Sequence, residues 1–162
     1  MQVYQAVIQG PQVDNSRHLV QFILDDQLYA IPLPLVERVV RTVALTRLPK
    51  APPIVLGIIN VGGAILPVVN IRKRFRLPDR EAGLRDHMII AITSRRKVVL
   101  PVDSAFGVEQ YREDSIVNPD QIAPQIQYVQ GVAKLHNGLV LIHNIDTFLS
   151  LDEHNALDDA LK

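Results

Sequence analysis

The residues of this sequence that could do chemistry begin with its histidines. The five histidines are His18, His87, His136, His143 and His154. No two of them have metal-ligand spacing on one element, and His136 and His143 occupy the two arms of a predicted hairpin with no third ligand in view. This pattern is typical of histidines at a surface or a strand edge, and it predicts no metal site.

Asp103 follows the apolar segment VVLPV and is the best-placed general base in the chain. An aspartate after a strand more commonly turns the chain with its carboxylate, and we expect that role here. The neighbouring Ser104 lacks the context of a nucleophile elbow. Residues 57–63 match neither glycine-rich phosphate-binding pattern and open a strand rather than a helix. The sequence therefore predicts a protein that is not an enzyme and needs no cofactor.

Charge is balanced, with 17 basic and 17 acidic residues and a formal net charge of zero. Basic residues gather at 72–76 and 95–97, which is the one basis for an alternative, a small nucleic-acid-binding barrel. A nucleic-acid binder usually has a basic excess and interleaved aromatic residues, and only Phe75 lies among these clusters. We expect no nucleic-acid partner, and solvated basic side chains at a strand end and a hairpin tip.

The 162 residues, 48% of them hydrophobic and none of them cysteine, fit one domain or two very small ones that share a core. No apolar run reaches the roughly 18 residues of a membrane helix. The first residues do not resemble a secretion signal. We expect a cytoplasmic protein without direct membrane insertion. Residues 1–17 are expected to form a flexible N-terminal lead-in to the domain.

The positions of these residues depend on a series of short predicted strands. They are 19–24, 28–33, 55–61, 64–71, 88–93, 98–102, 129–133 and 139–145. Apolar spacing over 35–40 predicts one or two helical turns, and residues 103–128 are predicted to be irregular. Ser150 and Glu153 have capping-box spacing, which predicts a helix over 151–161. Short strands at regular intervals indicate an all-β barrel or sandwich.

Part of segment 48–75 returns 74 residues later, in segment 122–149. The identical pairs include Gly57 and Gly131, Asn70 and Asn144, and Ile71 and Ile145. Each copy also has a turn pair near its middle, Gly62-Gly63 and Asn137-Gly138. A strand–turn–strand unit used twice predicts two small β-units built alike. Paired small barrels suit a binding scaffold better than an enzyme.

Several apolar residues are candidates for an exposed contact surface. They are Val36, Val39, Val40, Val98, Val99 and Val108, together with the Gly62-Gly63 turn. An apolar groove with a charged rim would suit an amphipathic helix from a partner. The alternative is that these valines fill the cores of the barrels.

Five segments between Leu19 and Leu161 carry a family resemblance. They are FILDDQLYAIPLPLV (22–36), RLPKAPPIVLGIIN (47–60), GGAILPVVNIRKRF (62–75), VDSAFGV (102–108) and YVQGVAKLHNGLVLIHNI (128–145). In their order and spacing they resemble the CheW family of chemotaxis adaptors. The resemblance implies two five-stranded SH3-like β-barrels packed around a shared core over residues 18–162, with a short C-terminal helix.

The resemblance also implies a function. CheW-like proteins are non-enzymatic scaffolds that couple a CheA-type histidine kinase, through its regulatory domain, to the cytoplasmic tips of methyl-accepting chemoreceptors in arrays at the inner membrane. The alternative is a specialised CheW-like protein of a variant chemosensory pathway, such as type IV pili or surface motility, that retains one of the two partners.

By position, the resemblance implies a set of partner-binding residues: Val36, Glu37, Arg38, Gly57, Gly62, Gly63, Val98, Val99 and Val108. The family commonly has an acidic residue where this chain has Arg38, although Glu37 is adjacent, and an arginine where it has Gly62. An acid–arginine pair therefore cannot form between these two positions. We expect the fold to be retained and the partner specificity to change.

Overall fold

The computed structural model describes residues 16–118, 128–135 and 138–162. The predicted lead-in at 1–17 lies outside the described residues except for Ser16 and Arg17, which already belong to the first strand. None of the helices in the described ranges is long and apolar enough to cross a membrane.

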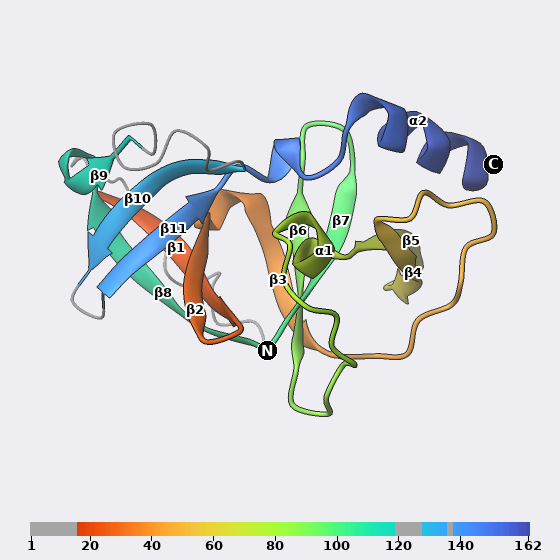
Figure 1. Ribbon diagram of the computed structural model, residues 1–162, viewed down its shortest axis with the longest axis horizontal. Helices are drawn as coiled ribbons and strands as arrows, with labels where there is room; N and C mark the ends of the chain where they lie inside the picture. The colour runs from red at the N-terminus through yellow and green to blue at the C-terminus, as the bar shows by residue number, and fades with distance from the viewer. Residues whose placement is uncertain (1–15, 119–127, 136–137) are drawn as a thin grey trace.

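The described residues form two sheets that lie side by side (Figure 1). The first has the order β8-β1-β2-β11-β10-β9, with β1 (Ser16–Leu24), β2 (Gln27–Pro32), β8 (Ser104–Arg112), β9 (Ile116–Val117), β10 (Val129–Leu135) and β11 (Gly138–His143). The second has the order β3-β6-β7-β5-β4, with β3 (Val36–Arg41), β4 (Val55–Val61), β5 (Ala64–Val69), β6 (His87–Ile92) and β7 (Lys97–Val102).

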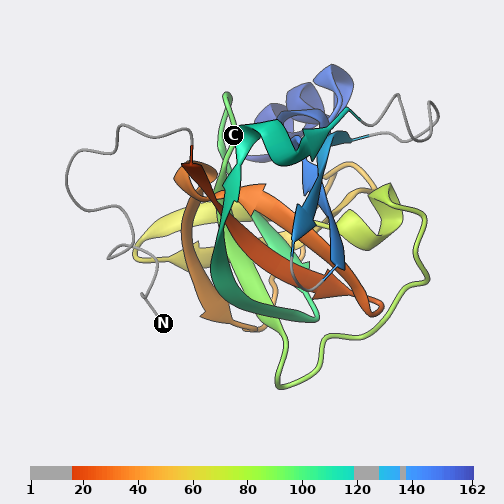
Figure 2. The same cartoon turned by 90° about the vertical axis from the view of Figure 1, so that its left-hand side faces the viewer.

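Each sheet closes because the chain leaving one edge returns to the other. In the first sheet, β8 continues through the 3-10 turn Glu113–Ser115 into β9, which pairs with β10 (Figure 2). In the second, the chain leaving β3 pairs Thr46 with Ile58 of β4 through backbone hydrogen bonds of 3.0 and 2.8 Å. The predicted all-β fold with two barrels is confirmed, with six strands instead of five in the first sheet.

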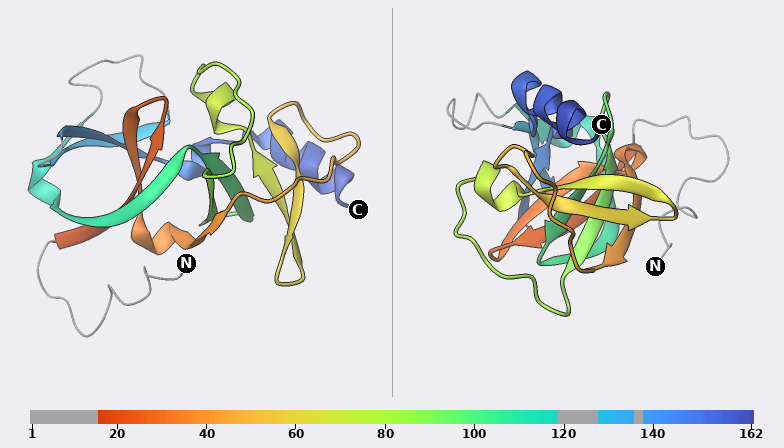
Figure 3. Two further views of the ribbon diagram at one scale, coloured as in Figure 1. Left: turned by 90° about the horizontal axis from the view of Figure 1, so that it is seen from below. Right: turned by 90° about the vertical axis from the view of Figure 1, so that its right-hand side faces the viewer.

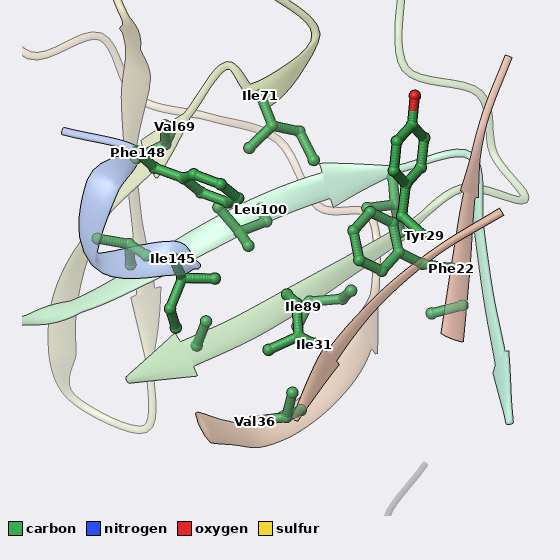
Figure 4. Packing of buried hydrophobic residues seen from close by; sticks show 14 of the residues in the cluster. Phe22, Tyr29, Ile31, Val36, Val69, Ile71, Ile89, Leu100, Ile145 and Phe148 are labelled. Carbon is green, nitrogen blue, oxygen red and sulfur yellow. The ribbon is translucent and has the colours of Figure 1, made fainter. Parts of the chain in front are cut away.

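A shared core lies between the barrels and takes side chains from both (Figure 4). Strands of both sheets and the segments that follow β5 and β11 contribute to it. Its members include Phe22, Tyr29, Ile31, Val36, Val69, Ile71, Ile89, Leu100, Ile145 and Phe148. A smaller apolar cluster fills each barrel separately. Since the largest cluster belongs to neither barrel alone, we expect the two to fold as one unit.

The helical turns predicted over 35–40 are wrong. Leu33–Leu35 forms a 3-10 turn, and β3 begins at Val36. The valines are β-branched and pair with β6, where Val39 lies opposite Ile89 and is fully buried. Tertiary pairing and the stiffness of β-branched side chains therefore outweigh the apparent helical spacing.

The irregular structure predicted over 103–128 is also wrong for its first part, because β8 is a nine-residue strand. Its buried positions are Ala105 and Tyr111. Between them lies Gly107, and the register with β1 shifts between Gln21 and Phe22. This bulge interrupts the period-two alternation that would have revealed a strand.

Two α-helices are present in the described residues: α1 (Ile71–Arg74) and α2 (Leu151–Ala160). The predicted C-terminal helix is confirmed, and its capping box is complete: Glu153 N–H donates to Ser150 Oγ (3.1 Å) and Ser150 N–H donates to Glu153 Oε1 (2.8 Å). The chain leaves the first barrel at β11, and α2 lies over the second barrel (Figure 3). The helix therefore ties the two barrels together.

Candidate protein-binding surfaces

The tip of the β4–β5 hairpin is an exposed turn made of two glycines. Gly62 and Gly63 have φ angles of +57° and +92°, in the left-handed region that side chains disfavour. The Gly63 N–H donates to Asn60 Oδ1 at 2.8 Å and fixes the turn. The tip therefore presents backbone rather than side chains to a partner.

Arg38 of β3 lies beside this tip. Its Nη2 atom is 3.8 Å from the place where a β-carbon on residue 62 would lie. Its side chain is exposed, and within the described residues it has no ion-pair partner, whereas the adjacent Glu37 pairs with Lys97. The resemblance implied that the tip lacks an arginine, because Gly62 stands where the family commonly has one. In the structure Arg38 of β3 places its guanidinium beside the tip, which sequence spacing alone does not reveal.

The candidate valines divide into buried and partly exposed residues. Val36, Val98 and Val99 are 9%, 1% and 0% exposed, so core packing, the alternative interpretation, holds for their side chains. Val108 is half-buried and packs against the shared core. A partner could therefore touch Val108 directly, whereas the other three would act through the shape of the surface above them.

Gly57, also a candidate contact residue, is buried at the closure of the second barrel. A β-carbon there would lie 2.5 Å from the backbone oxygen of Thr46. The register of β4 with β5 shifts at the same point, between Val55 and Gly57. The absence of a side chain lets the closing segment cross β4 closely.

Sequence reasoning missed an apolar groove on the second barrel, with a volume of about 450 Å³. Val43, Leu45 and Leu56 line it and are 48%, 37% and 42% exposed. Charged residues, among them Arg80 and Asp86, form part of its rim. Val43 and Leu45 alternate with Thr42 and Ala44 in the β3–β4 connector, and this alternation was the available sequence signal.

Asp103 has a structural role, but its carboxylate fixes the β1–β2 turn of the other barrel and not, as predicted, the turn that follows its own strand. Its Oδ2 accepts the backbone N–H of Asp25 at 2.9 Å, and its carboxylate binds Arg72 at 2.6 and 2.8 Å. Partial burial acts to raise the pKa of Asp103, but hydrogen bonds from Arg72 and Arg80 outweigh it and hold the pKa below its usual value. A carboxylate held in this way is a poor general base.

The expected solvation of the basic cluster at 72–76 is wrong for two of its members. Arg72 is 9% exposed and pairs with Asp25 at 2.7 Å as well as with Asp103. Arg74 pairs with Glu153 of α2 at 2.7 Å. Both side chains hold separate parts of the chain together instead of offering charge to a ligand.

Two histidines expected at surfaces or strand edges are buried. His143 is 2% exposed, its ring stacks on Phe75 with centroids 4.3 Å apart, and its Nδ1–H donates to the Tyr128 carbonyl at 3.1 Å. Burial lowers the pKa of His143 to about 4. His154 Nδ1 accepts from Arg96 Nε at 3.2 Å. His136 lies outside the described residues, and the residues that the structure does describe hold no cluster of metal ligands.

These features define a class of protein. Two fused barrels expose a glycine tip beside an exposed arginine, and an apolar groove with charges at its rim. The most plausible general base, Asp103, is engaged in structural contacts. This is the arrangement of a protein-binding scaffold.

The family follows from the sequence as a whole. The model of the CheW-like domain matches residues 18–153, and the chain belongs to this family. Proteins of the family are non-enzymatic scaffolds of chemotaxis signalling, and this chain has that adaptor role.

Individual relatives agree with this assignment. The chain is 26% identical over 145 residues to the chemotaxis protein CheW of Rhizobium meliloti, covering 88% of this chain and 94% of the relative. It is 28% identical over 152 residues to CheW of Treponema pallidum, covering 89% and 88%. The crystal structure of the scaffolding protein TtCheW from Thermoanaerobacter tengcongensis superposes with a TM-score of 0.77 at 29% identity, covering 85% of this chain and 94% of that one.

Proposed function

We propose that this chain couples the regulatory domain of a CheA-type histidine kinase to the cytoplasmic tip of a methyl-accepting chemoreceptor, at receptor arrays on the cytoplasmic side of the inner membrane. The observation that carries the proposal is the family match over residues 18–153, which includes both barrels and hence both surfaces described above. Neither surface requires bond-making chemistry.

The receptor tip would bind at the glycine hairpin beside Arg38, with Val108 at the edge of the shared core. Gly62 and Gly63 allow close approach of a helix end to the backbone, because they carry no side chain. The half-buried Val108 offers apolar area at the edge of the shared core. This combination supports the binding of an amphipathic helical hairpin.

The kinase domain would bind at the groove of Val43, Leu45 and Leu56. These three exposed apolar side chains make a shallow surface that suits another compact β-domain better than a narrow helix end. The groove is lined by the β3–β4 connector, β4 and the 79–86 segment and includes neither Arg38 nor the glycine tip, so the two partners could bind one molecule together.

A second candidate function is that of a specialised CheW-like protein that retains only one partner. The departures at Arg38 and Gly62 favour it, because they lie where the resemblance implies partner contact and neither residue lines the groove. Such a protein would bind the kinase domain and not the general receptors of the cell.

Isothermal titration of the purified protein with the kinase regulatory domain, and separately with a receptor cytoplasmic fragment from the same organism, tests both candidates. Leu45→Asp should abolish kinase binding and spare receptor binding, and Val108→Asp should do the reverse. Leu139→Asp is the matched control, since Leu139 of β11 is 58% exposed and lines neither surface. Binding of neither partner by the unmodified protein would overturn the adaptor function.

A further inference from the structure

We propose that Arg38 supplies the cation of the hairpin tip and that this site takes a helical hairpin carrying a carboxylate at its end. The inference rests on the proposed function and specifies the chemistry of the receptor tip that this chain would select.

The first support is the position of the guanidinium. Arg38 comes from β3, yet its Nη2 lies 3.8 Å from the point where a side chain on residue 62 would begin. Gly62 has nothing else from the rest of the chain near that point. The charge therefore stands over the turn, in the space that a side chain of the hairpin would otherwise occupy.

The second support is that this charge is not neutralised within the described chain. Residues 38–78 contain eight lysines and arginines and no aspartate or glutamate. Two of these eight, Arg72 and Arg74, pair with acidic residues from other parts of the chain. Arg38 has no such partner among the described residues, and the adjacent Glu37 is engaged by Lys97.

The third support is the apolar setting of the charge. Arg38 and Val40 are two residues apart on β3 and share one face of the strand. Val40 and Val61 are partly buried against the same cluster inside the second barrel, and Ile65, two residues beyond the turn, is 50% exposed. One guanidinium set among aliphatic side chains matches an amphipathic helix end with one acidic residue, whereas a nucleic acid requires several cations.

The chemistry of recognition follows from the guanidinium itself. A planar fork of donors binds a carboxylate through two parallel hydrogen bonds. The Gly63 N–H of the exposed turn already donates to Asn60 Oδ1, so the guanidinium is the donor that would hold the carboxylate. Recognition would therefore require an acid at the tip of the partner, and a lysine there would be rejected.

The test is a titration of the full chain with a cytoplasmic helical-hairpin fragment of a chemoreceptor from the same organism. We expect Arg38→Glu to weaken binding about tenfold or more. Arg47→Glu, which reverses another exposed charge of the same acid-free segment, should change it little. Replacing the acidic residues of the fragment's tip by glutamine should weaken binding of the wild-type chain and not that of Arg38→Glu.

A rescue variant separates a tip charge from a local structural role. The double variant Arg38→Gln, Gly62→Arg moves the cation from β3 to the hairpin without an acid beside it, and should recover most of the affinity that Arg38→Gln alone loses, with a circular dichroism spectrum equal to that of the wild type. If the wild-type chain binds the fragment and Arg38→Glu binds equally well, the proposal is overturned while the adaptor function stands. If the wild-type chain binds no receptor fragment, receptor coupling itself fails, and this proposal fails with it.

Discussion

The β4–β5 unit of the second barrel and the β10–β11 unit of the first use the same three residues for the same three purposes. Gly57 and Gly131 both lie where a closing segment crosses: a β-carbon would be 2.5 Å from Thr46 O in one barrel and 2.6 Å from Ile116 Cγ2 in the other. In both units the strand register shifts at this glycine. The glycine is thus a requirement of barrel closure.

Asn70 and Asn144 each end a hairpin and begin a short helical turn. Their backbone N–H groups donate to Ile54 O and Tyr128 O, both at 2.8 Å. Their side-chain oxygens accept N–H groups of that turn, at 3.1 Å from Lys73 and 3.2 Å from Asp146. The next residue in each copy, Ile71 or Ile145, then enters the shared core.

Beyond these positions the two units differ. His143 of β11 corresponds to Val69 of β5, and Asp146 corresponds to Arg72. The comparison teaches that the identical residues maintain the barrels, whereas the residues that differ decide how each barrel contacts the other and what it presents to partners. Four predictions test this division.

The largest effect should come from the shared core. Ile71 and Ile145 are 1% and 2% exposed, so Ile71→Ala and Ile145→Ala should each lower the free energy of unfolding by about 4 kcal/mol. Both variants should still unfold in one transition, measured by urea denaturation with circular dichroism. Two separate transitions, or a cost confined to one variant, would contradict a core that belongs equally to both barrels.

The second effect concerns His143, whose equivalent in the second barrel is Val69. Burial lowers the pKa of His143 to about 4, while an unfolded chain has a histidine pKa near 6.5. The unfolded state therefore binds a proton in this interval that the folded state does not. Neutral His143 therefore contributes fully to the free energy of unfolding above pH 6.5. This contribution, about 3 kcal/mol, is lost as the pH falls to about 4.

Replacing His143 by the residue of the other barrel checks this sign. The unfolding free energy of His143→Val, measured from pH 7 to pH 4, should fall less steeply than that of the wild type. His154, whose pKa is also lowered, by burial and by its neighbours Arg96 and Arg95, remains in both proteins and cancels in the difference. A constant difference across the range would show that His143 does not titrate there.

The sequence predicted the strands with regular alternation and the capped helix, because those signals are local. It failed where long-range pairing decides, as in β3 and in β8, whose bulge hides the alternation. It identified Gly62 as a contact position and yet missed the guanidinium beside it, since the approach of Arg38 depends on barrel closure. The groove of Val43 and Leu45 was missed because two alternating apolar residues in a connector do not show whether their side chains are exposed.

The third prediction asks whether the two closure glycines are equally strict. Gly57→Ala should cost about 3 kcal/mol, because the methyl group would meet a backbone oxygen that the closing strand holds in place. Gly131→Ala should cost about 1 kcal/mol, because it would meet a methyl of the half-buried Ile116, which can rotate away. Thermal unfolding of the two variants gives the order, and equal losses would show that both closures are equally rigid.

The smallest effect concerns the residue that follows the shared isoleucine, which in each unit reaches a hairpin turn of the opposite barrel. Arg72 pairs with Asp25 in the β1–β2 turn, and the carboxylate of Asp146 accepts the Ser94 N–H in the β6–β7 turn at 2.7 Å. Arg72 is nearly buried and also binds Asp103, whereas Asp146 is exposed. Arg72→Ala should therefore cost about 2 kcal/mol, because it leaves two carboxylates short of a partner.

Asp146→Ala should cost less than about 1 kcal/mol, since water can replace the acceptor at an exposed turn. If the contacts of Arg72 and Asp146 with the opposite barrel act independently, the double variant should lose the sum of the two single losses in unfolding free energy, measured by urea denaturation. A loss larger than the sum would mean that both contacts restrain the same relative motion of the two barrels. The two contacts between the barrels would then act together, and the shared core alone would not fix the relative position of the barrels.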